Sequence, residues 1–191
     1  MHTNQIQLLA KNKISIKKNS YTVIIGSNPS KTARSPILWN YFFKKTKQNY
    51  EMIPIDTTKK NINKILNVLE KDKKFKGGCV AVPFKEIIFK NLLKKNSVDK
   101  ITKNIGSVNC LYKKNNKVFG TNTDGDAGLR VFQKKFSQIK NKKCLILGFG
   151  GAGKAISAYF NSHLNTKIMI SNRTNLSKKV IKKNNIEFVK W

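Results

Sequence analysis

The chain contains 191 residues, of which 39 are Lys or Arg and 9 are Asp or Glu, so its formal net charge at pH 7 is +30. Hydrophobic residues make up 39% of the sequence and lie in short strand-like runs between helical patterns, which excludes a disordered chain and indicates an α/β protein. No apolar run approaches the ~20 residues of a membrane-spanning helix. We therefore expect a soluble, cytoplasmic protein without a membrane partner.

The positive charge is carried almost wholly by lysine, because only Arg34, Arg130 and Arg173 are arginines. A nucleic-acid-binding surface is expected to use the bidentate guanidinium group at several positions and to combine charge with aromatic residues. A basic nucleic-acid-binding protein is therefore the less favoured hypothesis, although such a charge attracts polyanions without sequence preference.

Three cysteines, Cys79, Cys110 and Cys144, lie far apart in apolar, strand-like settings. Their odd number and wide spacing predict buried free thiols in a reducing compartment. His2 and His163 are the only histidines, so no metal site is expected.

The first half of the chain reads as alternating strands and helices. Residues 1–19 are polar and basic and are predicted to form an N-terminal extension. Residues 21–26 form a β-branched run that predicts a buried strand. Ser35 and Pro36 then suit the N-cap and first position of a helix. The apolar face expected for this helix consists of Ile37, Leu38, Tyr41 and Phe42.

A second strand is predicted at residues 50–55, and the helix after it is amphipathic. A third strand is predicted at residues 77–83, followed by a helix at 84–93. Strand, helix and strand in this order predict a parallel βαβ unit. The apolar residues of the amphipathic helix are Ile62, Ile65, Leu66 and Leu69.

A hairpin is predicted where residues 108–112 turn through 113–116 into Val118 and Phe119. The next stretch, Gly120–Asp126, places two of the nine acidic residues, Asp124 and Asp126, before another apolar helical pattern. Either a helix N-cap or a functional carboxylate explains such a placement.

Residues 138–143 form a polar connector, and the boundary between two predicted domains, 20–137 and 138–191, is placed there. Beyond it, strands at 144–147, 167–171 and 186–189 alternate with helical patterns. This alternation predicts the first half of a Rossmann-type doubly wound parallel sheet.

Gly148, Gly150 and Gly153 follow the first of these strands in G-x-G-x-x-G spacing. The first glycine permits a tight turn, the second lets the backbone approach a pyrophosphate, and the third lets helix and strand pack closely. A dinucleotide site is therefore predicted here, with a merely flexible loop as the alternative.

The next strand ends in Ser171, Asn172, Arg173 and Thr174 rather than in an acidic residue. A carboxylate at this place would bind the ribose hydroxyls of NAD, whereas an arginine suits the 2′-phosphate of NADP. The sequence therefore favours NADP as the cofactor.

Five blocks form one ordered pattern over roughly residues 20–190: Ser35-Pro36-x-x-x-Asn40; Val80-x-Val82-Pro83-Phe84-Lys85-Glu86; Ile105-Gly106-Ser107-Val108-Asn109; Gly120-x-Asn122-Thr123-Asp124-Gly125; and Gly148-x-Gly150-Gly151-Ala152 with Asn172-Arg173-Thr174. This pattern resembles the shikimate dehydrogenase family. The resemblance implies an N-terminal α/β substrate-binding catalytic domain, a partial NADP-binding Rossmann domain, and the NADP-dependent reduction of 3-dehydroshikimate to shikimate in aromatic amino-acid and chorismate biosynthesis.

The resemblance also implies the roles of single residues. It makes Lys85 and Asp124 catalytic, and Ser35, Asn109 and Asp124 substrate-binding. Asp126 has no counterpart role and is expected to be the cap. The residues that the cofactor is expected to contact are Gly148, Gly150, Gly151, Ala152, Gly153, Asn172, Arg173 and Thr174.

The sequence departs from the family pattern at Ala33, Trp39, Cys79 and Ala81, where the family has Ser, His, Asn and Thr. Fewer donors for the substrate leave a related hydroxylated cyclic acid as an alternative substrate. Only three strands of the nucleotide domain are predicted, so a fragment or a degenerate relative that binds without turnover is a further alternative. A monomer or a homodimer is expected.

Overall fold

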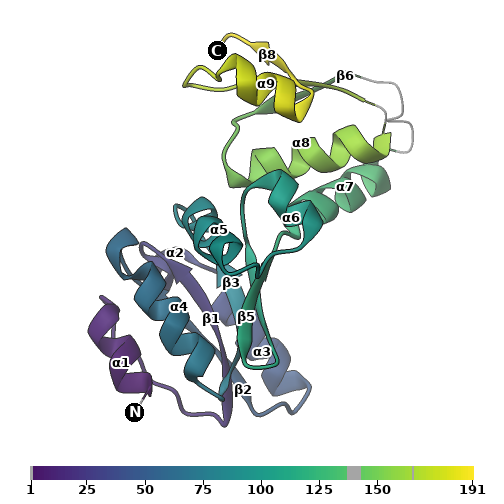
Figure 1. Cartoon of the computed structure of the whole chain (residues 1–191). Helices are drawn as coiled ribbons and strands as arrows, with labels where there is room; N and C mark the ends of the chain where they lie inside the picture. Colours follow the sequence, from purple (N-terminus) through teal and green to yellow (C-terminus); the bar gives the residue numbers. More distant parts are fainter. Residues whose placement is uncertain (1, 137–142, 165) are drawn as a thin grey trace. The chain divides into compact units, whose positions relative to one another are not determined.

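The computed structural model describes residues 2–136, 143–164 and 166–191 (Figure 1). The chain forms two compact units, the first consisting of Met1–Lys103 and Val108–Thr121, and the second of Asn104–Ser107 and Asn122–Trp191. Most of the connector at 138–143, where the sequence places a domain boundary, lies outside the described residues. The predicted α/β class, with a mixed sheet followed by a partial Rossmann sheet, is confirmed.

The first unit is built on a five-stranded sheet with the order β2-β1-β3-β4-β5. Its three parallel strands are β1 (Ser20–Gly26), β2 (Tyr50–Asp56) and β3 (Phe75–Val80). The antiparallel hairpin of β4 (Cys110–Lys114) and β5 (Lys117–Thr121) extends it beyond β3. The parallel βαβ unit and the hairpin predicted from the sequence are therefore both confirmed.

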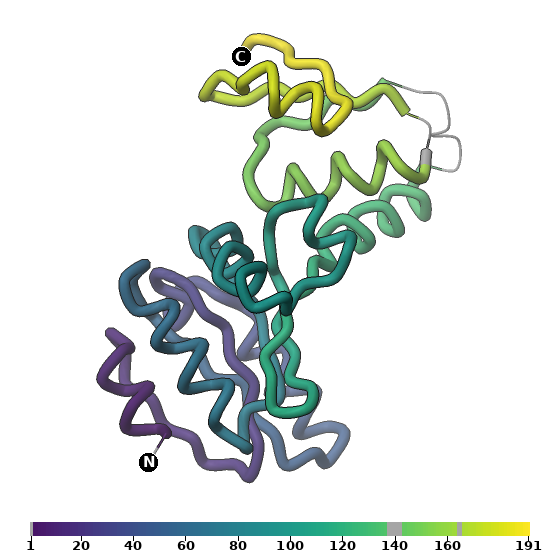
Figure 2. The backbone as a smooth tube through the Cα atoms, viewed as in Figure 1, coloured from purple at the N-terminus to yellow at the C-terminus, as the bar shows by residue number. Residues whose placement is uncertain are grey.

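The hairpin turn is set by two asparagines. Asn115 and Asn116 have φ values of 49° and 59°, and a two-residue hairpin loop with both φ values positive matches the right-handed twist of its strands. Asn tolerates this left-handed backbone better than most residues. The turn residues therefore fix the register of β4 against β5. The course of the hairpin can be followed in the backbone trace (Figure 2).

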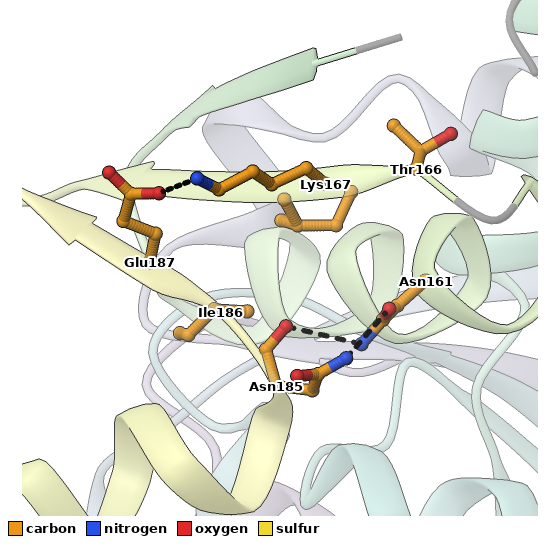
Figure 3. Close-up of a pocket in the computed structure, with 7 residues that line it drawn as sticks. Asn161, Thr166, Lys167, Asn185, Ile186 and Glu187 are labelled. Carbon is orange, nitrogen blue, oxygen red and sulfur yellow. Dashed lines mark hydrogen bonds and ion pairs between the residues drawn. The ribbon is translucent and has the colours of Figure 1, made fainter. Parts of the chain in front are cut away.

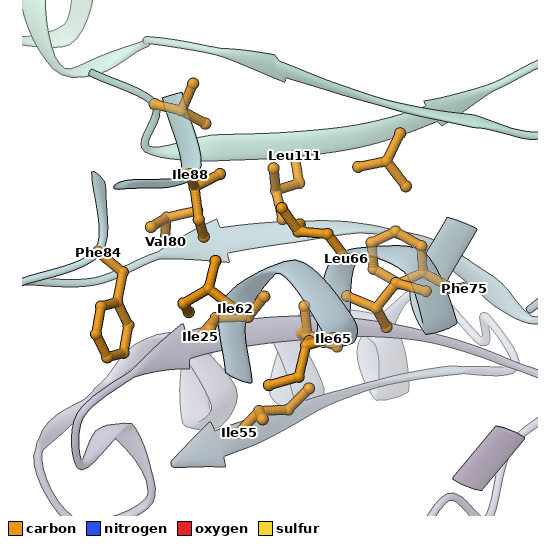
Figure 4. Close-up of a cluster of buried hydrophobic side chains, with 14 of the residues drawn as sticks. Ile25, Ile55, Ile62, Ile65, Leu66, Phe75, Val80, Phe84, Ile88 and Leu111 are labelled. Carbon is orange, nitrogen blue, oxygen red and sulfur yellow. The ribbon is translucent and has the colours of Figure 1, made fainter. Parts of the chain in front are cut away.

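The main core of the first unit lies between one face of the sheet and the helices α4 and α5 (Figure 4). All four apolar residues predicted for α4 (Ile62–Lys71) are buried. Helix α5 (Lys85–Lys94) contributes Ile88 and Leu92, which are 0% and 1% exposed. A 3-10 turn at Lys59–Asn61 leads into α4, and α6 (Lys100–Ile105) precedes β4.

The N-terminal segment is part of this packing. Helix α1 (His2–Leu9) contacts α4, and its Ile6 is completely buried. Ile14 is also buried in the same core. The predicted polar extension therefore supplies apolar contacts to the first unit.

Helix α3 (Ser35–Lys45) packs on β2 through a different face from the one predicted. Ile37, Leu38 and Tyr41 are 73%, 66% and 68% exposed, and Phe42 is 45% exposed. Phe43 is buried instead, and the Asn40 side chain exchanges hydrogen bonds of 3.1 and 2.7 Å with the backbone of Met52. The prediction failed because α3 carries apolar residues on two sides, and the bonds to Met52 decide which side faces the sheet. The short helix α2 (Pro29–Thr32) precedes α3.

The second unit contains, within the described residues, a parallel three-stranded sheet of β6 (Lys143–Leu147), β7 (Lys167–Ser171) and β8 (Glu187–Val189). Helices α7 (Asp124–Lys135), α8 (Gly151–Leu164) and α9 (Lys178–Asn184) accompany it. Its core includes Leu129 of α7 and Phe160 of α8. Helix α7, which the sequence assigned to residues 20–137, thus packs within the second unit.

Two expectations concern properties of the whole chain. None of the three cysteines is in a disulfide, as predicted, but each is half-buried rather than buried. Among the described residues, no helix combines the length and apolar character needed to cross a membrane.

A buried tyrosine and a buried aspartate connect β1 to the segment after α4. The Tyr21 hydroxyl donates to Asp72 Oδ2 at 2.9 Å, and the two residues are 0% and 6% exposed. Burial, reinforced by the hydrogen bond and the nearby charge of Asp72, raises the pKa of Tyr21 well above its ordinary value. The folded state therefore holds this proton more firmly than the unfolded chain does.

We predict that Tyr21→Phe lowers the free energy of unfolding at pH 7 by about 1–3 kcal/mol, because it leaves the Asp72 carboxylate without this donor. Above about pH 10, where an unfolded tyrosine ionises, the unfolded state of the unsubstituted protein releases a proton that the folded state keeps. Its stability advantage over the variant therefore shrinks as pH rises. Denaturant unfolding at several pH values measures this, with the exposed Tyr112→Phe as the control. An unchanged difference from pH 7 to 11 would contradict the account.

Candidate functional site

Four chain segments meet at one end of the first unit's sheet, where the parallel strands have their carboxyl ends. This end is called the carboxyl edge below. Strands β1 and β3 are parallel and end at this edge, so the loops that lead to Ser35 and Lys85 begin there. Cys79 pairs with Cys110 and Cys110 pairs with Thr121, so β4 begins and β5 ends at the same edge. Ligands of open α/β sheets bind outside the carboxyl ends of the parallel strands.

The backbone at Asn109 is bonded on both sides. Its carbonyl oxygen accepts from the Val80 amide at 2.8 Å, and its amide donates to the Thr121 carbonyl oxygen at 3.2 Å. The preceding residue, Val108, donates its amide to the Lys85 carbonyl oxygen at 3.0 Å. The structure therefore brings the segments of Lys85 and Asn109, predicted from separate blocks, side by side.

Lys85 is the first residue of α5 and is half-buried. Phe84 and Ile88, on either side of it along the chain, are 3% and 0% exposed. These two apolar side chains fix the rotation of the first helical turn against the core. Lys85 is thus held at the carboxyl edge while its backbone remains part of a rigid helix.

Ser35 lies in the first turn of α3 and is half-buried. The loop before it is held to the end of β2, because Ser30 donates its amide to Asp56 Oδ1 at 2.8 Å and its hydroxyl to Asp56 Oδ2. Asp56 is only 4% exposed. The helix begins at Ser35 itself, with Arg34 at the N-cap position, so the predicted capping role of Ser35 is wrong by one residue.

The departure at Ala81 has a packing consequence. The Ala81 amide donates to the Ile25 carbonyl oxygen at 2.8 Å. A methyl group placed on Gly26 would approach the Ala81 Cβ to 3.1 Å. The ends of β1 and β3 are therefore close together at this point, and Ala81 presents no hydroxyl to a ligand.

In the second unit, a buried asparagine fixes the start of α7. Asn122 is 3% exposed, and its Nδ2 donates to both the carbonyl oxygen and the Oγ of Ser107 at 3.0 Å. Its Oδ1 accepts from the Asp124 amide at 3.0 Å. The Ser107 hydroxyl in turn donates to the Gly151 carbonyl oxygen at 3.2 Å. Asp124 is thereby positioned relative to the first turn of α8.

Ser107 and Asn122 hold the start of α7, a role that the sequence patterns did not predict. An asparagine two residues before an acidic helix start is a recognisable local signal, because its side chain readily accepts from a backbone amide two residues on. The pairing with Ser107 has no local signal.

The expectation that Asp126 caps α7 is wrong. The N-cap position is Thr123, whose side chain makes no capping bond. The Asp126 carboxylate instead accepts from Arg130 Nε at 2.9 and 3.1 Å. A carboxylate at this place in the helix reaches the residue four positions on more easily than it reaches the free amides behind it.

The glycine-rich turn lies between β6 and α8, as predicted. Gly148 has a φ of +98°, and its amide donates to the Ser171 carbonyl oxygen at 2.7 Å. A Cβ on Gly153 would lie 2.1 Å from the Gly148 carbonyl oxygen. The tight turn and the close packing of helix against strand therefore both require glycine.

The residues around the turn fit a dinucleotide. A Cβ on Gly150 would meet nothing within 4 Å, so the backbone there is open to a ligand, beside the free amides at the start of α8. Asn172 Oδ1 accepts from the Phe149 amide at 3.0 Å, and its Nδ2 donates to the carbonyl oxygen and Oγ1 of Thr174 at 2.8 and 2.9 Å. This network holds the loop that carries the exposed Arg173.

The second unit also has a hollow of about 230 Å³, at the end of the sheet opposite to the glycine-rich turn (Figure 3). It is formed at the amino ends of β7 and β8, where Lys167 Nζ pairs with Glu187 Oε2 at 2.6 Å. Asn161 Nδ2 donates to the Asn184 carbonyl oxygen at 3.2 Å on its other side. Because dinucleotides bind at carboxyl ends, this hollow is not assigned to the cofactor.

In the part of the chain that the structure describes, no group of three or more His, Cys, Asp or Glu residues could hold a metal ion.

The family model of the shikimate dehydrogenase substrate-binding domain matches residues 24–111. A shikimate dehydrogenase (NADP(+)) of Pelagibacter ubique is 36% identical over 174 residues, which are 89% of this chain and 63% of that protein. The crystal structure of shikimate dehydrogenase from Aquifex aeolicus has 30% sequence identity and a TM-score of 0.79, over 93% of this chain and 64% of that one. A shikimate dehydrogenase in complex with NADP+ has 26% identity and a TM-score of 0.78, over 96% and 64% of the two chains.

The chain thus spans less than two thirds of the length of these relatives. The residues that the family model matches include Ser35, Lys85 and Asn109 of the first unit.

We predict that Gly153→Ala destabilises the second unit, whereas Gly150→Ala leaves its stability within about 0.5 kcal/mol. Alanine improves helix propensity by about 1 kcal/mol, but overpacking against a fixed carbonyl costs about 1–3 kcal/mol, and the clash at Gly153 is with backbone. Hydrogen exchange of the β6 and α8 amides, together with thermal unfolding, measures both variants. Equal stability of the two would refute the close packing of β6 and α8.

Proposed function

The chain belongs to the shikimate dehydrogenase family, and from this membership we propose that it reduces 3-dehydroshikimate to shikimate with NADPH. The observation that supports the proposal most directly is the backbone hydrogen bond from the Val108 amide to the Lys85 carbonyl oxygen, which joins the chain segment of the candidate proton donor to that of the candidate substrate residue Asn109. The glycine-rich turn with Asn172 supports a dinucleotide at the second unit.

The reaction converts a ring ketone, a hydride and a proton into a secondary alcohol. NADPH, when bound, supplies the hydride to the carbonyl carbon. The Lys85 ammonium donates its proton to the carbonyl oxygen as negative charge develops there, and the amine then regains a proton from solvent. In the reverse direction the neutral amine accepts the hydroxyl proton. General acid–base catalysis of this kind typically contributes roughly 100- to 10,000-fold to a rate.

Asn109 is proposed to orient the ring. Its side-chain amide both donates and accepts, so it can bind a hydroxyl group in either role. The two backbone bonds to Val80 and Thr121 restrict its movement, and a fixed partner loses less entropy on binding a ligand.

Ser35 is proposed to bind the substrate carboxylate. It lies in the first turn of α3, where unpaired backbone amides and the positive end of the helix favour an anion. The Ser30–Asp56 bonds hold the loop before it. A carboxylate at Ser35 and hydroxyls at Asn109 together define the chemical class of ligand, a hydroxylated cyclic acid.

Asp124 is proposed as the partner of Lys85 and a further substrate contact. Lys85 belongs to the first unit and Asp124 to the second, so kinetics must test this partnership. The bonds from Asn122 hold the start of α7, and a carboxylate there accepts a hydroxyl proton in a hydrogen bond with the substrate.

NADP(H) is the proposed cofactor because Arg173 follows the strand β7 that lies next to β6. Its guanidinium group, with Thr174 beside it, suits the two charges of a 2′-phosphate. The Asn172 side chain accepts a hydrogen bond from the Phe149 amide, which holds the loop of Arg173 against the glycine-rich turn.

A second candidate function is binding without shikimate turnover. It is favoured by Ala81, which offers no hydroxyl at the carboxyl edge, and by Cys79 in place of an amide-bearing residue. A related hydroxylated cyclic acid is then the preferred ligand. NADPH binding in calorimetry, with no oxidation of NADPH by 3-dehydroshikimate, would support this second function over the first.

We predict that Lys85→Ala lowers kcat for NADPH-dependent reduction of 3-dehydroshikimate by roughly 100- to 10,000-fold, since it removes the proton donor. Lys90→Ala is the matched control, because Lys90 is an exposed lysine on the same helix, and it should keep kcat unchanged. Steady-state absorbance of NADPH measures both. Equal rates for Lys85→Ala and the unsubstituted chain would remove Lys85 from the mechanism.

A further inference from the structure

Strands β3 and β4 place two cysteines directly opposite each other. Cys79 and Cys110 are partners in the antiparallel register. The pair Gly78–Leu111 lies on one side of them, and the hydrogen bond between Val80 and Asn109 lies on the other side, at the end of the ladder. No local pattern in the sequence indicates this pairing, because the two residues are 31 positions apart.

The hydrogen-bond pattern identifies the type of pair. The Val80 amide donates to the Asn109 carbonyl oxygen at 2.8 Å, one residue after Cys79 and one residue before Cys110. Hydrogen-bonded and non-hydrogen-bonded pairs alternate along an antiparallel ladder. Since Val80 and Asn109 form a hydrogen-bonded pair, the neighbouring pair of Cys79 and Cys110 is a non-hydrogen-bonded one, whose Cα atoms are about 4.5 Å apart. Disulfides span Cα separations of roughly 4.4–6.8 Å. The two backbones are therefore already close enough to be bridged.

Both cysteines also face the same side of the sheet. They line one hollow of about 240 Å³, whose other walls include Trp39 and Phe43 of α3 and Met52 of β2. Each cysteine is half-buried rather than sealed in the core. A small reagent can therefore approach the pair from the open face, and the two sulfur atoms do not lie on opposite faces of the sheet.

Two simpler roles account for less of this arrangement. A structural metal site needs about four ligands, and no third His, Cys, Asp or Glu joins the pair among the described residues. Packing alone explains an apolar thiol at either position, but it does not require two thiols in one register pair on an open face.

We propose that Cys79 and Cys110 form a reversible cross-strand disulfide, making this pair a site of oxidative modification. The oxidant is a low-molecular-weight disulfide. One cysteine thiolate attacks a sulfur of the small disulfide, forming a mixed disulfide and releasing one small thiolate. The second cysteine thiolate attacks the protein sulfur of that mixed disulfide and releases the other small thiolate. The protein loses two protons and two electrons, and the small disulfide is reduced to two thiols.

The modification would lie beside the candidate substrate residue. Asn109 precedes Cys110, and Val80, which holds the Asn109 carbonyl, follows Cys79. A bond between the cysteines fastens β3 to β4 where Asn109 leaves the sheet. Any effect on turnover rests on the proposed function, but formation of the disulfide does not.

Cys144 provides the internal control. Like the other two it is half-buried and forms no disulfide, and burial raises the pKa of its thiol as burial raises the pKa of the Cys110 thiol. Its register partner is Ile168 rather than a cysteine. It therefore shares the partial exposure of the pair and the raised pKa of Cys110, but it has no cysteine opposite it in the sheet.

The experiment equilibrates the full chain in buffers of increasing ratio of oxidised to reduced glutathione, quenches with acid, alkylates free thiols and maps peptides without reduction. We expect one product with the mass of a single chain, in which the Cys79 and Cys110 peptides are joined and Cys144 remains alkylated or carries glutathione. Cys144→Ser should keep the cross-link, and Cys79→Ala or Cys110→Ala should each abolish it.

The proposal is overturned if Cys79 and Cys110 stay alkylated or carry separate glutathiones at every ratio. A cross-link from either of them to Cys144, or between two chains, would also overturn it. The mapping of the unsubstituted chain decides the matter even if an alanine variant does not fold, and it is independent of any enzyme assay.

Discussion

The site in the first unit depends on the backbone of Asn109, which is bonded to β3 through Val80 and to β5 through Thr121. Buried backbone groups need such partners, and here the partners come from strands on both sides of the chain. The adjoining bond from Val108 to Lys85 adds the start of α5 to the same network. One short segment therefore joins the backbone at the start of α5 to the ends of β3 and β5.

In the second unit, glycine residues set the geometry of the turn between β6 and α8. The positive φ of Gly148 turns the chain out of β6. The Gly148 carbonyl oxygen then lies so close to position 153 that only glycine fits there. Asn172 then closes the loop from the neighbouring strand. In both units the polar groups gather at carboxyl ends of parallel strands, because that is where the connections to the helices begin.

Sequence patterns predicted those features of the fold that depend on residues close together in the chain. The four apolar residues of α4, the hairpin through residues 113–116 and the glycine-rich turn between strand and helix each carry their own signal, and the structure confirms all three, with the hairpin loop shortened to Asn115 and Asn116. The face of α3 was predicted wrongly because its aromatic residues occupy more than one side, and bonds from Asn40 to Met52 make the choice. The Ser107–Asn122 bonds and the Cys79–Cys110 register join residues far apart in sequence, so no periodicity indicates them. The roles taken from the family pattern remain proposals that the fold permits.

The most direct test of the central claim is a shikimate titration of the isotope-labelled chain, followed by the amide and side-chain signals in NMR spectra. We expect saturable shifts at Ser35, Lys85 and Asn109, at the carboxyl ends of the parallel strands of the first sheet. No shifts are expected at Lys167 or Glu187, which line the hollow at the amino ends of the strands of the second sheet. Saturable shifts confined to that hollow, or none at the carboxyl edge up to millimolar shikimate, would contradict it.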